Sequence, residues 1–299
     1  MATIAVGCGQ LTWNQFRAVE SDAWPEERVL SEIAVAGYDG APASPVGNRS
    51  AREVVALYER YGLRPAPGYL SAAFWEADRR ATILEDARRY AAFAREVGCR
   101  ELYVAASGFD YVTRRGLTRR EVAGHVAPED ALTDDEYRRA AEVLTEVGAI
   151  TLGEGVRSCF HNHVGTPIET RQEIDRLLTL VDPDTLFVGP DTGHLAWAGA
   201  DAVAFCRDYL DRIKTLHLKD IDGRVARHGR DEGWAYGVSV EHGLFAELGD
   251  GEVDFPAIVG LLREIGFDGW VIVETDVTQR ATALESAEIS RRYLRGLGV

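Results

Sequence analysis

Four short apolar runs in the second half of the chain each end at a residue type that binds metal ions. The residues at these ends are His161, Asp191, His217 and Glu274. A run of four to eight apolar residues bounded by turn signals is typical of a buried strand. Because the carboxyl ends of parallel strands meet at one end of a barrel, the four side chains are expected to reach one pocket. This regularity constrains the fold more than any other feature of the sequence.

Strand-like and helix-like segments alternate along the 299 residues. We expect strands at 3–6, 38–40, 63–70 and 101–105, and in the runs ending at 161, 191, 217 and 274. We expect helices at 25–36, 50–62, from about 71 to 97, 133–153, 170–181, 201–209, 254–265 and from 282 onward. Such alternation implies a parallel sheet, and eight units imply an α/β fold of the (β/α)8 TIM-barrel type, as a single domain over 1–299. A doubly wound sheet is the alternative, but it would not bring the last four strand ends together.

Helix starts and connections follow from local chemistry. Thr133 with Glu136 and Thr170 with Glu173 form capping boxes, which open two of the helices. Residues 107–131 are irregular and charged, and we expect them to cover one end of the fold. Residues 222–251 are rich in glycine and charge, and we expect a long loop there that is more than a connector.

Composition excludes several classes of protein. The net charge is −15, with no basic stripe, so the electrostatic attraction needed for nucleic-acid binding is missing. The four cysteines are far apart, which argues against disulfides and a thiolate zinc site. The sequence has neither a signal-peptide pattern nor an apolar stretch of membrane-spanning length. We therefore expect a cytoplasmic protein that binds neither membranes nor nucleic acid.

The four strand-end residues are candidate metal ligands. Two imidazoles and two carboxylates suit a divalent ion of the Mn, Co, Zn, Fe or Mg class. Each residue has a plainer interpretation taken singly: a strand-end histidine is often only hydrogen-bonded, and the sequence around Asp191 is also a good turn. Glu274 follows four apolar residues, and a buried carboxylate needs a cationic partner. Four such residues in the same position relative to their strands favour the metal site.

A second set of polar residues lies two or three positions beyond the proposed ligands. It consists of His163, His194 and Lys219. A neutral histidine beside a metal can act as a general base, and a lysine can hold a hydroxyl or an oxyanion. The alternative is that the two histidines only orient the ligands.

Five motifs carry a resemblance to a known family. They are Phe160–Thr166, Pro190–Leu195, Leu216–Asp220, Gly243–Gly251 and Gly269–Glu274. Together with the opening at Gly9–Trp13, they resemble the xylose isomerase-like barrel superfamily, and within it the inosose dehydratases. Sugar isomerases and epimerases of this superfamily usually have a glutamate where this chain has His161. That difference disfavours epimerisation by two carboxylates and favours removal of one proton with expulsion of a hydroxyl.

The resemblance implies a metal-dependent hydro-lyase that dehydrates a cyclic keto-polyol such as 2-keto-myo-inositol, in inositol catabolism. The implied cofactor is a divalent ion, Mn²⁺ or Co²⁺ first, with Mg²⁺, Zn²⁺ or Fe²⁺ as alternatives. We expect His194 as the base, with Glu274 or His163 next, and Lys219 or His163 as the acid. The implied partner is a small polyol or sugar, and such barrels often form homodimers or homotetramers.

Other activities share the fold and stay open at this stage. A metal-dependent sugar isomerase or epimerase would use the same residues without releasing water. A barrel subunit that eliminates an aglycone from a 3-keto glycoside and a non-catalytic sugar-binding barrel are further alternatives. An endonuclease of this fold needs a basic DNA-binding face, which the net charge of −15 opposes.

Overall fold

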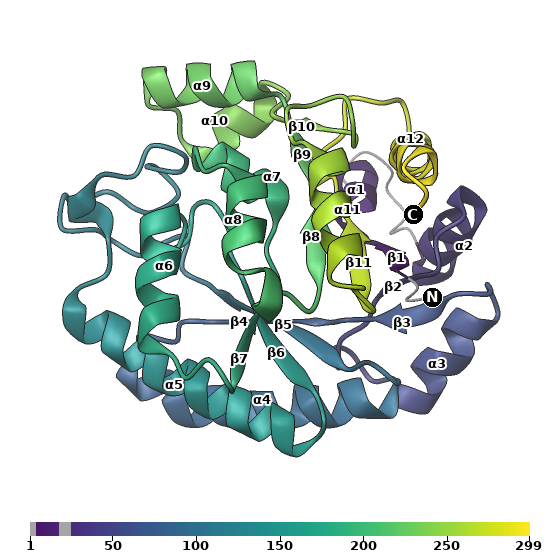
Figure 1. Ribbon diagram of the computed structural model, residues 1–299, viewed down its shortest axis with the longest axis horizontal. Coiled ribbons are helices and arrows are strands. Elements are labelled where there is room, and N and C mark those ends of the chain that lie inside the picture. Colours follow the sequence, from purple (N-terminus) through teal and green to yellow (C-terminus); the bar gives the residue numbers. More distant parts are fainter. Residues whose placement is uncertain (1–3, 18–24) are drawn as a thin grey trace.

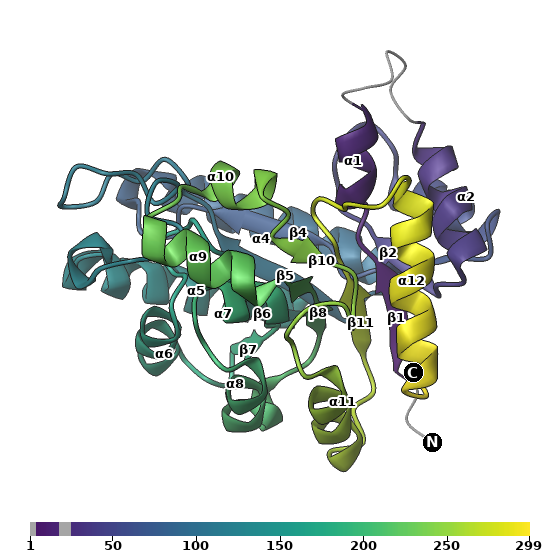
Figure 2. The ribbon, with the colours of Figure 1, turned by 90° about the horizontal axis from the view of Figure 1, so that it is seen from above.

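The computed structural model describes residues 4–17 and 25–299, and in this part the strands form a barrel surrounded by helices (Figures 1 and 2). The barrel strands are β1 Ala5–Cys8, β2 Gly40–Pro42, β3 Arg64–Ala66, β4 Tyr69–Ala72, β5 Glu101–Ala106, β6 Arg157–His161, β7 Leu186–Val188, β8 Leu216–Leu218 and β11 Trp270–Val273. All their pairings are parallel, and the first strand pairs with the last, β1 with β11. The predicted (β/α)8 barrel is therefore confirmed.

The barrel closes although its regular hydrogen bonding falls into two arcs, β3-β2-β1-β11-β8 and β4-β5-β6-β7. At one junction, the third strand position is interrupted between β3 and β4, so β3 pairs with β2 while β4 pairs with β5. Gly68 lies at this break, where an added Cβ would come within 2.2 Å of the Ala43 carbonyl oxygen. At the other junction, isolated parallel bridges join Val188 to Ile213 and Asp191 to His217. The second bridge brings two of the predicted metal ligands side by side.

Helices surround the strands. Every expected helix is present close to its expected position, except that the one expected from about 71 begins only at Arg80, and the helices at 11–17, 192–197, 223–232 and 236–241 were not expected. The helices are α1 Leu11–Arg17, α2 Glu26–Ala36, α3 Ala51–Glu59, α4 Arg80–Glu96, α5 Asp134–Gly153, α6 Arg171–Leu180, α7 Thr192–Trp197, α8 Ala202–Asp208, α9 Gly223–Glu232, α10 Tyr236–Glu241, α11 Phe255–Glu264 and α12 Ala283–Gly296. Both predicted capping boxes are present, at the starts of α5 and α6. Among the described residues, no helix combines the length and the apolar character needed to cross a membrane.

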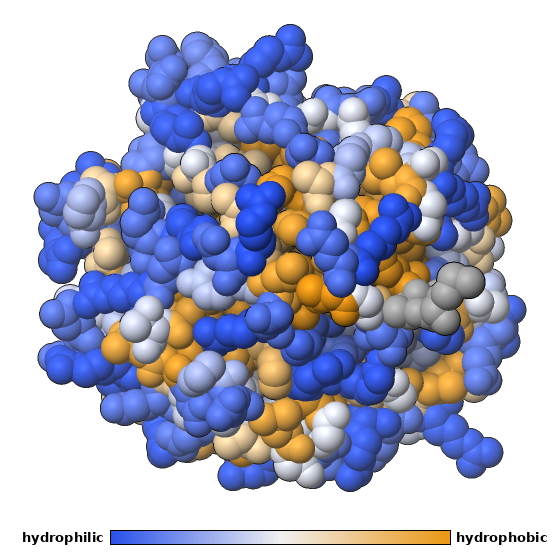
Figure 3. All heavy atoms as spheres, in the orientation of Figure 1, coloured by the Kyte–Doolittle hydropathy of each residue, from blue (hydrophilic) through white to orange (hydrophobic). Residues whose placement is uncertain are grey.

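The molecule has a mainly hydrophilic surface and an apolar core. Hydrophilic side chains cover most of the face shown in Figure 3, in keeping with the net charge of −15. The apolar core fills the space between strands and helices, and a small cluster of Ala66, Tyr103 and Ile272 lies within the barrel. All four cysteines are buried and free, so no disulfide stabilises the fold.

The expectation of a long loop over residues 222–251 was wrong. The segment contains α9, α10 and strand β10 Phe245–Ala246, which pairs antiparallel with β9 Asp220–Ile221. Asp222 caps α9 by accepting hydrogen bonds from the backbone N–H groups of Arg224 and Val225, and Gly233 ends it at a φ of 67°. The sequence did not indicate α9 because the few residues that this helix buries are small, so the apolar stripe typical of a surface helix is absent. Figure 1 shows α9 and α10 above the end of the barrel.

Residues 107–131 are largely irregular, as expected, and a buried arginine fastens them to the barrel. The Arg119 side chain is fully buried. Its guanidinium donates two hydrogen bonds to the Glu173 carboxylate, at 2.8 and 3.0 Å, and lies 3.6 Å from Glu169. Glu169 in turn accepts hydrogen bonds from the backbone N–H groups of Gly124 and Gly165. One cation thus pairs with two buried carboxylates and holds the covering segment in place.

Replacing Arg119 by methionine should lower the free energy of unfolding by about 3–5 kcal/mol, because it leaves two buried carboxylates without their counter-ion. Urea denaturation at neutral pH measures the change. Arg52→Met, at an exposed position of α3, is the control and should change stability by less than about 0.5 kcal/mol. A loss below about 1 kcal/mol for Arg119→Met would show that this ion pair does not hold the segment.

Candidate metal centre

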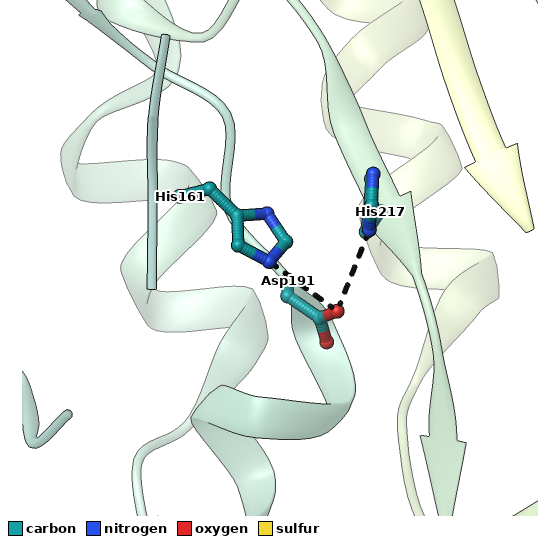
Figure 4. Close-up of side chains that lie close together, drawn as sticks. All are labelled: His161, Asp191 and His217. Atoms are coloured by element: carbon teal, nitrogen blue, oxygen red, sulfur yellow. Dashed lines mark ion pairs between the residues drawn. The ribbon is translucent and has the colours of Figure 1, made fainter. Parts of the chain in front are cut away.

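Three of the predicted ligands converge at the carboxyl ends of adjacent strands. His161 ends β6, Asp191 follows β7, and His217 lies in β8. The Nε2 atom of His161 is 3.9 Å from Oδ2 of Asp191, and Nδ1 of His217 is 3.7 Å from the same oxygen (Figure 4). One donor atom from each residue lies within 4.8 Å of the other two. Side chains that are 26 to 56 positions apart in sequence therefore form one compact group.

The Asp191 carboxylate is held so that one oxygen faces the histidines. Its Oδ1 atom accepts a hydrogen bond of 2.9 Å from the backbone N–H of His194 and so caps α7. The Asn162 side chain accepts from the Asp191 backbone N–H and donates to its carbonyl oxygen. Oδ2 is buried and makes no hydrogen bond, although the Lys219 ammonium lies 3.3 Å from it. The backbone and the cap thus fix the oxygen that a metal ion would bind.

The donor set and its burial fit a divalent ion. His161, Asp191 and His217 are at most 4% exposed, and a buried polar atom without a partner costs about 1–3 kcal/mol. Burial and the neighbouring His217 hold the pKa of His161 well below its usual value, which keeps its imidazole neutral. Imidazole nitrogens with a carboxylate suit Mn, Co, Zn or Fe. An ion contacting Asp191 Oδ2 would satisfy this buried atom.

Glu274 lies beside this group and contacts one of its members, His217. Glu274 follows β11, and its Oε2 atom lies 3.2 Å from His217 Nδ1. Burial alone would lower the pKa of His217, but the charges of Glu274 and Asp191 outweigh it and raise that pKa to about 9. Binding of a metal at Nδ1 must displace this proton, so affinity should fall as the pH falls. Glu274 lies beside the three-residue group, and its role as a fourth ligand stays a prediction.

Lys219 lies at the centre of the negative charge. Its side chain is fully buried, and Nζ is 3.3 Å from Asp191 Oδ2, 3.1 Å from Glu274 Oε2 and 2.6 Å from Asp276 Oδ1. Burial would lower the pKa of Lys219, but the three carboxylates raise it well above its ordinary value. The sequence analysis missed Asp276. Its position two residues beyond Glu274 could have indicated it, because alternate residues of an extended segment face the same side.

His163 and His194 form a second group with Asp276, in which the donor atoms lie within 4.8 Å of one another. His163 donates from Nδ1 to the Val164 carbonyl oxygen, which leaves Nε2 as its acceptor atom. Burial, reinforced by the charge of Lys219, lowers the pKa of His163 to about 4. His194 accepts from the Val164 N–H at Nδ1, and its Nε2 lies 3.2 Å from Lys219 Nζ. Both ring nitrogens of His194 are therefore engaged.

A cavity of about 660 Å³ opens from the metal centre. Its inner end is lined by His161, His163, His217 and Glu274, together with Tyr69 and Tyr103. His194 and Lys219 lie behind this surface and are fully buried. The cavity is of the size that small-molecule sites commonly have.

The matching family model is the xylose isomerase-like TIM barrel, over residues 18–297. The chain is 30% identical over 304 aligned residues to an inosose dehydratase of Lacticaseibacillus casei, covering 98% of this chain and 96% of that protein. It is 32% identical to an inosose dehydratase of Klebsiella pneumoniae, covering 90% and 89%.

Solved structures share the fold at much lower sequence identity. A probable 3-DHS dehydratase from Bacillus anthracis superposes with a TM-score of 0.70 at 13% identity, covering 98% of this chain and 99% of that one. A sugar phosphate isomerase/epimerase from Parabacteroides distasonis gives 0.68 at 17% identity, covering 99% and 94%. At these identities the likeness concerns the fold alone.

Asp191→Asn should weaken Mn²⁺ binding at least about 100-fold, because it removes the ligand charge while an amide oxygen keeps the helix cap. Isothermal titration calorimetry measures the affinity. Asp201→Asn is the matched control, since Asp201 caps α8 by the same contact, accepting from the Ala204 N–H, at an exposed position. Equal affinities for the two variants would contradict the metal centre.

Proposed function

Because the chain belongs to the xylose isomerase-like TIM barrel family, we propose that it is a metal-dependent hydro-lyase that removes water from a cyclic keto-polyol such as 2-keto-myo-inositol. The observation that carries the proposal is the buried group of His161, Asp191 and His217 at the inner end of the cavity. The relatives named inosose dehydratase, which match nearly the whole chain, support this choice of substrate.

The metal has a defined part in the proposed reaction. Held by His161, Asp191 and His217, a divalent ion such as Mn²⁺ or Co²⁺ would polarise the substrate ketone and stabilise negative charge on its oxygen. Tyr69 and Tyr103 line the cavity beside these residues and limit the space around the ring of the substrate. Side chains that reach the cavity would remove the α proton and assist the departure of the hydroxyl.

Glu274 is the base in this proposal. Its Oε2 atom is engaged by His217 and Lys219, which leaves Oε1 to accept the proton α to the ketone. Oε1 lies next to Gly9, where an added Cβ would come within 2.6 Å of it. Glycine at this position therefore leaves room for the carboxylate at the cavity wall.

His163 orients the substrate for the elimination. Its Nε2 atom is not used by the hydrogen bond to Val164, and its ring lines the cavity. When the α C–H bond breaks, the proton goes to Glu274, and the electron pair forms the new double bond as the β C–O bond breaks. The proton held by Glu274 then passes to the departing hydroxyl, which leaves as water, while His163 Nε2 accepts a hydrogen bond from a substrate hydroxyl and orients the ring.

His194 and Lys219, expected from the sequence as base and acid, take supporting roles in this proposal. Both are fully buried, and they contact each other rather than the cavity. The rings of His163 and His194 are in contact, with centroids 3.8 Å apart and planes inclined by 39°, so His194 fixes the orientation of its neighbour. A residue that reacts with substrate needs access that these two side chains lack.

Glu274→Gln should lower kcat for loss of water from 2-keto-myo-inositol by about 10²- to 10⁴-fold, because the amide cannot accept the α proton. Mass spectrometry and the absorbance of the unsaturated product measure the reaction of Mn²⁺-loaded protein. Glu264→Gln, at an exposed position of α11, is the control and should leave kcat unchanged.

The same preparation distinguishes the other activities of this fold. Failure to release water from 2-keto-myo-inositol, together with interconversion of ketoses and aldoses, would contradict the proposal and favour a sugar isomerase or epimerase.

A further inference from the structure

The chain avoids lysine almost completely. Of its 33 basic residues, all are arginine except Lys214 and Lys219. Lys214 lies near the surface, where it donates a hydrogen bond to the Asp211 carbonyl oxygen. Lys219 is fully buried among the site residues. The ammonium group of lysine is a compact point charge, whereas the guanidinium of arginine is larger, planar and directional. The use of lysine at this position therefore indicates a need for a compact positive charge, similar in size to a metal ion.

The surroundings of Lys219 are those of a cation site. Oxygens of Asp191, Glu274 and Asp276 lie 2.6–3.3 Å from its Nζ atom, and His194 Nε2 lies at 3.2 Å. Asp276 Oδ1 is buried and makes no hydrogen bond of normal geometry, although it is the oxygen nearest to Nζ. Carboxylate oxygens and an imidazole nitrogen are also the donors that a divalent ion takes.

The second group of donors lies against this ammonium. His163, His194 and Asp276 could hold an ion by themselves, since their donor atoms lie within 4.8 Å of one another. Asp191 Oδ2 lies between the two groups. It is close to His161 and His217 of the first group and to Lys219, which lies against the second. Enzymes with two adjacent ions often share a ligand between them at a separation of about 3.5–4 Å. The fold therefore provides the ligands of a two-ion centre, with an ammonium in the second position.

We propose that the Lys219 ammonium takes the place of a second divalent cation and limits the centre to one ion. The inference rests on the metal centre of the proposed function and identifies the residue that sets its stoichiometry. One divalent ion and one ammonium neutralise the three buried carboxylates of Asp191, Glu274 and Asp276, whereas two divalent ions beside Lys219 would leave excess positive charge.

This arrangement keeps His163 available to the substrate. A second ion would bind the Nε2 atom of His163 and withdraw it from the substrate. Lys219 instead contacts His194, and His163, whose hydrogen bond to Val164 uses only Nδ1, lines the cavity. Lys219 is thus a positioning residue that acts through the charge and the space it occupies.

Mn²⁺ stoichiometry tests the proposal without any measurement of activity. Wild-type protein should bind about one ion per chain, and Lys219→Ala, which removes both charge and bulk, should bind about two. Electron paramagnetic resonance of free Mn²⁺ during a titration gives the count, and a spin-coupled spectrum should appear only in Lys219→Ala. The double variant Lys219→Ala/Asp276→Asn should return to one ion, and Lys214→Ala should behave as wild type.

Lys219→Met provides an independent measurement should the alanine variant fail to fold. It keeps most of the side-chain volume and removes only the charge, so the first Mn²⁺ should bind at least about tenfold more tightly, because a nearby positive charge is gone. Lys214→Met should leave that affinity unchanged. A purely structural lysine would give the opposite result, since its loss would disorder the carboxylates and weaken binding.

The outcomes separate this inference from the proposed function. Two ions in wild-type protein, one ion in folded Lys219→Ala, or weaker binding in Lys219→Met would overturn the role of Lys219 and leave the metal centre intact. Absence of any bound ion in wild-type protein would overturn both.

Discussion

The burial of three carboxylates at one end of the barrel is the constraint on which the site depends. Asp191, Glu274 and Asp276 approach one another closely enough for Lys219 to contact all three. Such a concentration of negative charge, largely shielded from water, is stable only with compensating cations. One is built into the chain as Lys219, and the donor geometry around Asp191 suits a metal ion as the other. The same charges act on His217, whose pKa they raise to about 9.

The barrel determines that these groups meet. Each residue ends or follows a parallel strand, and closure through the Asp191–His217 bridge and the β1–β11 pair directs the strand ends into one cavity. In the proposed function, the groups that contact the substrate are separate from the groups that support them. His163 and Glu274 reach the cavity, while His194 and Lys219 lie directly behind them. The rear layer fixes charge and orientation, and the front layer is left to contact substrate.

The sequence was sufficient to predict the barrel and the meeting of its strand-end residues, because both follow from the period of strand–helix units. The convergence of His161, Asp191 and His217 needs only parallel strands in a closed sheet. Asp276 was missed because it lies three residues beyond the end of β11, after the apolar run that marks the strand has ended. The helix α9 was missed because it buries small residues such as Ala226 and Gly229 instead of an apolar stripe. The burial of Lys219 depends on packing against α7 and β10, and that of His194 on contact with β10, which no local pattern encodes.

The central claim is that this chain holds one divalent ion at its strand ends. The most direct measurement is an anomalous difference map from crystals of the wild-type protein grown with Mn²⁺. The account predicts a single strong peak in contact with His161, Asp191 and His217, with Lys219 still bound to Asp276. No peak at this position, or a second peak where the Lys219 ammonium lies, would contradict it.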